Sequence, residues 1–134
     1  MFAKPDVVFA DLEAWAVTYL VAQLAARAEP FTSGVVVDHI TPAPIPARLV
    51  TVRDDGGPRG AVTKTSSLAV NVWAATEADA SDLVRMVVAL LERAVATGPV
   101  VGHVSTSGPA RVPEESGTPH WFASVDLVHR GTSL

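Results

Sequence analysis

The sequence contains no cysteine among its 134 residues. This absence excludes disulfide frameworks, zinc sites that need thiolate ligands, and thiol nucleophiles. Cationic side chains are also scarce, with ten Lys and Arg against fourteen Asp and Glu and a formal net charge of -4. Because binding to a phosphate backbone depends on cationic side chains, we do not expect a free-standing nucleic-acid-binding protein.

The sequence also lacks a hydrophobic run long enough to cross a bilayer. Its longest apolar stretch, residues 14–26, contains Thr18 and Gln23 and is shorter than the roughly 20 residues that a membrane helix requires. Acidic residues stand where a signal peptide would need its apolar segment: Asp6, Asp11 and Glu13. We therefore expect a protein with no membrane partner that stays in the cytoplasm where it is made.

Charged residues make up 18% of the sequence, whereas hydrophobic residues make up 49%. Disordered chains are poor in hydrophobic residues and rich in charged ones, so this composition predicts a folded protein. A compact chain of this length has a radius of gyration of roughly 14 Å and buries about two-thirds of its unfolded surface. We expect a single domain over residues 1–134 with a substantial hydrophobic core.

Residues 6–27 are predicted to form a helix that is apolar nearly all round, with Pro5 and Asp6 at its start. One stripe at helical spacing consists of Val8, Leu12, Trp15 and Tyr19. A helix with apolar residues on its other side as well is usually covered twice, and in so small a domain we expect another subunit to provide the second cover. The residues predicted for this subunit interface are Phe9, Val17, Leu20 and Leu24.

The remaining elements are separated by proline and glycine. Period-two patterns predict strands at 35–40, 48–53, 68–74, 100–107 and 120–130, and a long exposed loop at 54–66. A second helix is expected between the N-cap Thr76 and the pair Gly98-Pro99. This order predicts an α+β fold, in which a mixed or antiparallel sheet of four to five strands carries two main helices.

Motifs that carry chemistry are few. The run from Gly57 to Thr65 has threonine where a phosphate-binding loop needs glycine before its lysine. The histidines show no pair at helical metal-ligand spacing, and they lie on or beside predicted strands: His39, His103, His120 and His129. We predict no catalytic residue, no metal site and no cofactor. The alternative of a different class is a small ligand-binding or catalytic domain that uses His103, His120 and Asp126.

Basic residues gather around the Gly-Gly-Pro loop, where only Asp54 and Asp55 oppose them. One interpretation is a solvated loop. The other is a contact arm whose cationic side chains pair with carboxylates on a neighbouring protein and whose glycines let it order on docking. The residues of this predicted protein interface are Arg48, Arg53, Asp54, Asp55, Arg59 and Lys64.

Three runs give the sequence a family resemblance: LVTVRDDGGP at 49–58, LAVNVWA at 68–74 and WFASVDLVHRG at 121–131. With this order of elements, the chain resembles the tail terminator proteins of long-tailed bacteriophages, in particular those of phages of actinobacteria. Small neck components, such as head-tail adaptors and connectors, share this size and α+β character and remain the neighbouring alternative.

The resemblance implies a structural virion protein and no enzyme. Tail terminators form a hexameric ring that caps the last ring of tail-tube subunits, stops tube polymerisation and presents the joining surface for the head-side connector. The implied partners are further copies of the chain, the tail tube protein and the head-tail connector protein, with DNA only passing through the lumen. The implied location is the head-proximal end of the tail, after assembly in the host cytoplasm.

Overall fold

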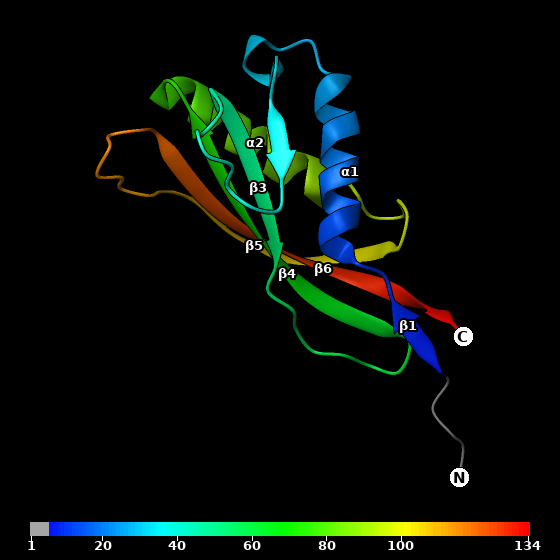
Figure 1. Ribbon diagram of the computed structural model, residues 1–134. Coiled ribbons are helices and arrows are strands. Elements are labelled where there is room, and N and C mark those ends of the chain that lie inside the picture. The colour runs from blue at the N-terminus through cyan, green and yellow to red at the C-terminus, as the bar shows by residue number, and fades with distance from the viewer. Residues whose placement is uncertain (1–5) are drawn as a thin grey trace.

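The structure is a computed structural model that describes residues 6–134. It confirms the α+β fold, because two main helices pack on one curled, mixed sheet (Figure 1). The sheet has six strands, more than the four to five expected. In chain order the elements are β1 (Val7–Phe9), α1 (Leu12–Ala25), the 3-10 turn η1 (Pro30–Thr32), β2 (Val36–Asp38), β3 (Arg48–Asp54), β4 (Thr63–Ala74), α2 (Glu77–Glu92), β5 (Val100–Arg111) and β6 (His120–Ser133).

Strand β6 organises the sheet. On one side it pairs with β4, which continues the sheet through β3 to the edge strand β2. On its other side it pairs with β5 over most of its length and with β1 at residues 131–133. All pairs are antiparallel except β2 with β3. Residues 7–9 and 131–133 therefore lie side by side, and β2 and β5 occupy opposite edges of the sheet (Figure 1).

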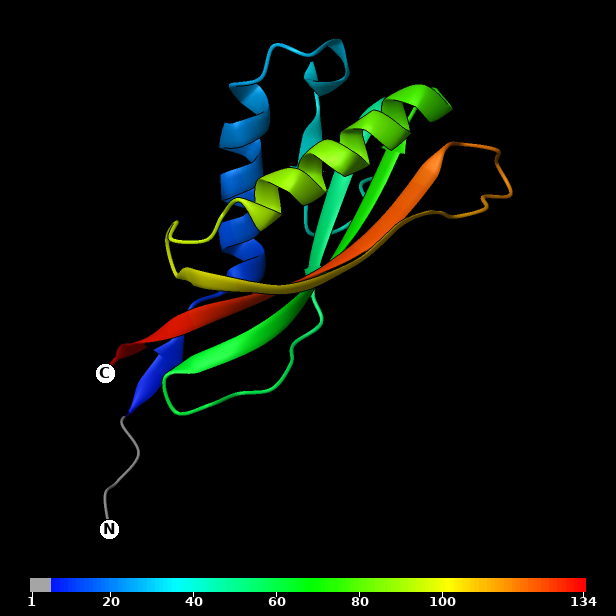
Figure 2. The same cartoon turned by 180° about the vertical axis from the view of Figure 1, so that it is seen from behind.

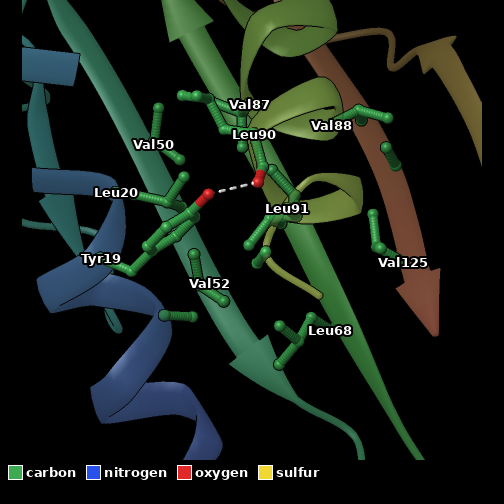
Figure 3. Packing of buried hydrophobic residues seen from close by; sticks show 14 of the residues in the cluster. Tyr19, Leu20, Val50, Val52, Leu68, Val87, Val88, Leu90, Leu91 and Val125 are labelled. Atoms are coloured by element: carbon green, nitrogen blue, oxygen red, sulfur yellow. Dashed lines mark hydrogen bonds between the residues drawn. The ribbon is translucent and has the colours of Figure 1, made fainter. Parts of the chain in front are cut away.

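Both helices contribute to a single core on one face of the sheet (Figure 2). Alternate residues of the central strands point toward the helices, as the strand period of two requires. Tyr19 of α1 lies in this core, and its hydroxyl donates a hydrogen bond of 2.6 Å to the Leu90 carbonyl of α2 (Figure 3). That carbonyl belongs to the last turn of α2, where backbone acceptors lack partners within the helix.

The first helix is shorter than predicted. It begins at Leu12, after the N-cap Asp11, whose side chain accepts a hydrogen bond from the Ala14 N–H. Two valines and a phenylalanine, residue types favoured in strands, form β1 before the cap and pair with the end of β6, a long-range contact that helical spacing does not reveal. Phe9 is therefore a strand residue, and its assignment to the helix was wrong. The predicted helix start at Pro5 lies outside the described residues.

The predicted long loop after β3 is shorter and is bound to the sheet. Strand β4 begins at Thr63, and backbone hydrogen bonds connect the segment before it to β4, including Thr65 N–H to the Pro58 carbonyl at 2.9 Å. A Cβ atom at Gly57 would lie 2.1 Å from the Thr65 carbonyl oxygen, so this close approach requires glycine. These backbone contacts hold the segment against β4 in the single chain.

The boundaries of the other elements agree more closely with the sequence. Thr76 caps α2 as predicted, accepting a hydrogen bond from the Asp79 N–H. Strand β5 continues to Arg111, beyond the predicted residue 107, which shortens its connection to β6. None of the helices in the described part of the chain has the length and hydropathy of a membrane span.

Candidate functional site

The predicted contact arm corresponds in part to the end of the β3–β4 hairpin. Arg53 and Asp55 form an ion pair there, with Nε 2.6 Å from Oδ1. Hydrogen bonding between the two side chains raises the pKa of Arg53 and lowers the pKa of Asp55. Both groups are exposed, so this pairing contributes little to stability and its charges stay accessible to a partner.

Arg59 and Lys64 face each other across an isolated bridge at the same end of the hairpin. The Arg59 guanidinium donates to the Val7 carbonyl at 3.2 Å and lies 4.7 Å from the centre of the Phe9 ring. Arg59 is exposed, and its contacts with β1 are a carbonyl and an aromatic ring, neither of which neutralises its charge. It therefore presents a positive charge at the tip of the molecule.

Two residues assigned to the arm have internal roles. Arg48 stands at the opposite end of β3, about 17 Å from Arg53 at the rise of a strand, where it binds the Ser33 carbonyl and the Asp79 carboxylate at 2.8 and 3.0 Å. The Asp54 carboxylate accepts from the Gly56 N–H at 2.8 Å. Including Arg48 in the arm was wrong. Arg48 and Arg53 are close in sequence, but an extended strand places them near its opposite ends.

The first helix does have two apolar sides, but the predicted interface residues do not share one surface. Leu20 is fully buried and Leu24 is 3% exposed, both in the core, so these two assignments were wrong. Val17 is half-buried at the side of the helix. The outward face of α1 consists instead of exposed residues without charge: Ala14, Thr18, Val21, Ala22 and Ala25.

A hollow of about 310 Å³ lies beside this outward face. Ala14, Val17 and Thr18 of α1 line it together with His39, which follows β2. Two carboxylates, those of Asp11 and Glu13, also line it. The Glu13 carboxylate accepts a hydrogen bond of 2.9 Å from the Asp54 N–H, which connects the start of α1 to the end of β3.

Exposed aliphatic residues that the sequence reasoning missed occur on β5. Val101 and Val104 are 42% and 58% exposed, and Val21 on α1 is 50% exposed. Single-sequence patterns do not reveal them, because a strand with bulges departs from strict alternation.

The three residues of the enzyme alternative do not converge. His103 contacts Thr106 and Glu92, whereas His120 is held by Asn71 and Glu114. The Asp126 carboxylate accepts from Ser67 and Ser105, and it lies about 20 Å along β6 from His120 at the rise of a strand. Within residues 6–134, no three His, Asp or Glu side chains come together as a metal-binding group.

His129 is buried in a distinct environment at the end of the core. Its Nε2 lies 2.9 Å from Ser66 Oγ, and the Phe9 ring meets its imidazole edge-on at a centroid distance of 5.7 Å. Its Nδ1 has no hydrogen-bond partner among the described residues. Burial therefore lowers the pKa of His129, because the neutral imidazole is favoured where water is excluded.

Comparison with known proteins gives a structural match. No family model and no curated protein matches the sequence. Among solved structures, the chain is similar to one described as "Virion of native gene transfer agent (GTA) particle", with a TM-score of 0.58 and 19% identity. The match covers 92% of this chain and 100% of that chain. The two chains share a fold.

Proposed function

We propose that this chain is a structural component of a phage-type virion. The observation that carries the proposal is the fold shared with a gene transfer agent virion chain along the whole of that chain. A match of complete domains is stronger support than a match of one motif, although a fold alone assigns no role. In this proposal the chain has no catalytic activity and needs no metal or cofactor.

Within that class we propose the role of tail terminator. Copies of the chain form a ring, expected to be a hexamer, that caps the tail tube, stops its polymerisation and presents the joining surface for the head-side connector. The support is the sequence resemblance at residues 49–58, 68–74 and 121–131. Its location is then the head-proximal end of the tail, with DNA passing through the ring.

Two surfaces of the chain support assembly rather than a solitary protein. The hairpin end exposes the charges of Arg53, Asp55 and Arg59, which suit polar contacts with the tube or a neighbour. The outward face of α1 is uncharged and adjoins a hollow. A cyclic ring needs two different, complementary surfaces on every subunit, because its contacts are heterologous.

The experiment that tests the role is electron microscopy of the purified chain mixed with tubes of the tail protein encoded nearest to it. We expect rings that sit on one end of each tube and tubes of fixed length. A chain that stays single and never decorates tube ends would contradict the terminator role. Rings that bind the head connector but leave the tubes bare would indicate a head-tail adaptor instead.

A further inference from the structure

Strand β1 is attached to the sheet by a short ladder at one end of the molecule. It pairs only with the end of β6, over three residue pairs, the last of which joins Phe9 to Gly131. Beyond these pairs, the Leu134 N–H donates to the Asp6 carbonyl at 3.0 Å. Because a two-stranded pairing is marginally stable in water, β1 depends on the side chains that it packs against.

The side chain that fixes β1 in place is Phe9, which is half-buried. Its ring meets the His129 imidazole edge-on at a centroid distance of 5.7 Å, and the Arg59 guanidinium lies 4.7 Å from its centre. His129 itself is only 1% exposed. Phe9 is therefore one of the groups that keep water away from this histidine.

His129 cannot take up a proton in this position without a change in its surroundings. Its Nε2 lies 2.9 Å from Ser66 Oγ, but its Nδ1 has no hydrogen-bond partner among residues 6–134. An imidazolium carries an N–H donor on both ring nitrogens, so one donor would be left buried and unpaired, together with a buried charge. Proton uptake therefore requires that water reach the ring.

The charged groups around His129 do not remove this requirement. Burial lowers its pKa; Asp54 at the end of β3 raises it, and Lys64 of β4 lowers it further. Glu13 of α1 accepts from the Asp54 N–H, and the Arg59 cation lies on the Phe9 ring. The β5 residue in register with His129 and residues 7–9 of β1 bring no charge.

Opening β1 is the least disruptive way to bring water to the ring. The other strands beside His129, β4 and β5, pair with β6 over eleven and eight residue pairs, so moving either one would disrupt the sheet. We propose that residues 6–9 form an acid-released strap, which detaches from the end of β6 when His129 takes up a proton, while the other strands stay paired. Release exposes the Phe9 ring and frees backbone groups of residues 131–133. This device goes beyond the proposed virion role and does not rest on it.

Hydrogen–deuterium exchange of the natural chain at pH 7.5 and pH 5.5 tests the strap, with rates corrected for the intrinsic effect of pH on amide exchange. Between the ordinary histidine pKa of about 6.5 and the lowered pKa of His129, each pH unit favours the open strap by up to about tenfold. We therefore expect protection in peptides 6–10 and 132–134 to fall about five- to tenfold. Unchanged protection overturns the proposal.

Urea distinguishes release of the strap from unfolding of the whole chain. Release exposes little surface, so exchange in the strap should be nearly unchanged in about 1 M urea. Peptides from β4 and α2 should exchange more slowly than the strap and should accelerate in urea. Strap and core peptides that exchange at one rate, with one dependence on urea, would show that acid unfolds the whole chain and would overturn the proposal.

Two substitutions that leave His129 in place should change the effect in opposite directions. Lys64→Gln removes a cation that lowers the pKa of His129, so its strap should lose less protection between the two pH values than the natural strap. Asp54→Asn removes the carboxylate that raises this pKa, so its strap should lose more. Equal losses in the two variants would contradict the assignment of the effect to His129.

The matched controls replace one histidine at a time. His129→Gln should make strap protection independent of pH, whereas His39→Gln, at an exposed position, should behave as the natural chain does. Phe9→Ala removes the ring that contacts His129, and its strap should be open already at pH 7.5. Strap protection that still falls with pH in His129→Gln would overturn the proposal.

Discussion

At the residue scale, we expect His129 to make folding sensitive to pH. Its imidazole is buried, its Nδ1 has no partner among residues 6–134, and burial lowers its pKa. The unfolded chain, in which histidine has a pKa of about 6.5, therefore binds more protons than the folded chain just below that value. Stability should be unaffected by His129 above that pH and should decrease as the pH falls through it. The decrease should level off below the lowered pKa of the folded state.

Urea unfolding between pH 7.5 and pH 5 measures this effect. We expect the natural chain to lose free energy of unfolding as the pH falls, and His129→Gln to lose less over the same range. The charges near His129 have opposing effects, since Asp54 raises its pKa and Lys64 lowers it. His39→Gln removes an exposed histidine and serves as the control. Equal pH dependence in the natural chain and His129→Gln would contradict the prediction.

At the scale of elements, Tyr19 joins the two helices through a carbonyl that α2 cannot satisfy itself. The Ala94 N–H, which would bond Leu90 in a continuing helix, bonds the Leu91 carbonyl instead. Tyr19→Phe leaves the Leu90 carbonyl buried without its donor, and we expect a loss of about 1–2 kcal/mol in the free energy of unfolding. Chemical denaturation measures it. A loss no larger than that of Thr18→Val, a neighbouring exposed substitution, would mean that water replaces the hydroxyl.

The hairpin end gives a prediction about assembly. Arg53→Glu/Arg59→Glu reverses exposed charge at the tip, and we expect it to impair tail completion while the chain stays folded. Arg48→Gln should instead lower stability slightly and leave tails normal, because Arg48 binds Ser33 and Asp79 within the chain. Counting completed tails by electron microscopy distinguishes the two. Normal tails from the charge-reversed chain would dismiss the tip as a contact surface.

The sequence was informative where local rules decide the structure. Thr76 and the periodic apolar face predicted α2 correctly, because caps and helical spacing are local. Strand β1 was missed because its existence depends on Gly131, Thr132 and Ser133 at the other end of the chain. Leu20 and Leu24 were misplaced for a related reason. A helix that is apolar all round does not reveal which side meets its own sheet.

At the scale of the whole molecule, the pairing of β1 with the end of β6 connects features that are remote in sequence. Strand β1 places Phe9 edge-on against the His129 imidazole, and the Val7 carbonyl of β1 accepts a hydrogen bond from the Arg59 guanidinium. A Cβ atom at Gly131 would lie 1.8 Å from Val7 Cγ1, so any other residue there would force the Val7 side chain to move. The N-terminal strand thus links the buried histidine to the charged tip.

Ending the chain after Arg130 should release β1 and expose Phe9. Because Phe9 is half-buried and full burial of a large apolar side chain is worth about 2 kcal/mol, we expect a loss of about 1 kcal/mol and a fall in the melting temperature of roughly 3–6 °C. Thr132→Ala/Ser133→Ala keeps the backbone pairing and should melt normally, since both side chains are exposed. The shortened chain should also lose part of its pH dependence, because water then reaches His129 and its pKa returns toward the ordinary value. A shortened chain with unchanged melting temperature and pH dependence would show that β1 stays in place without its partner strand.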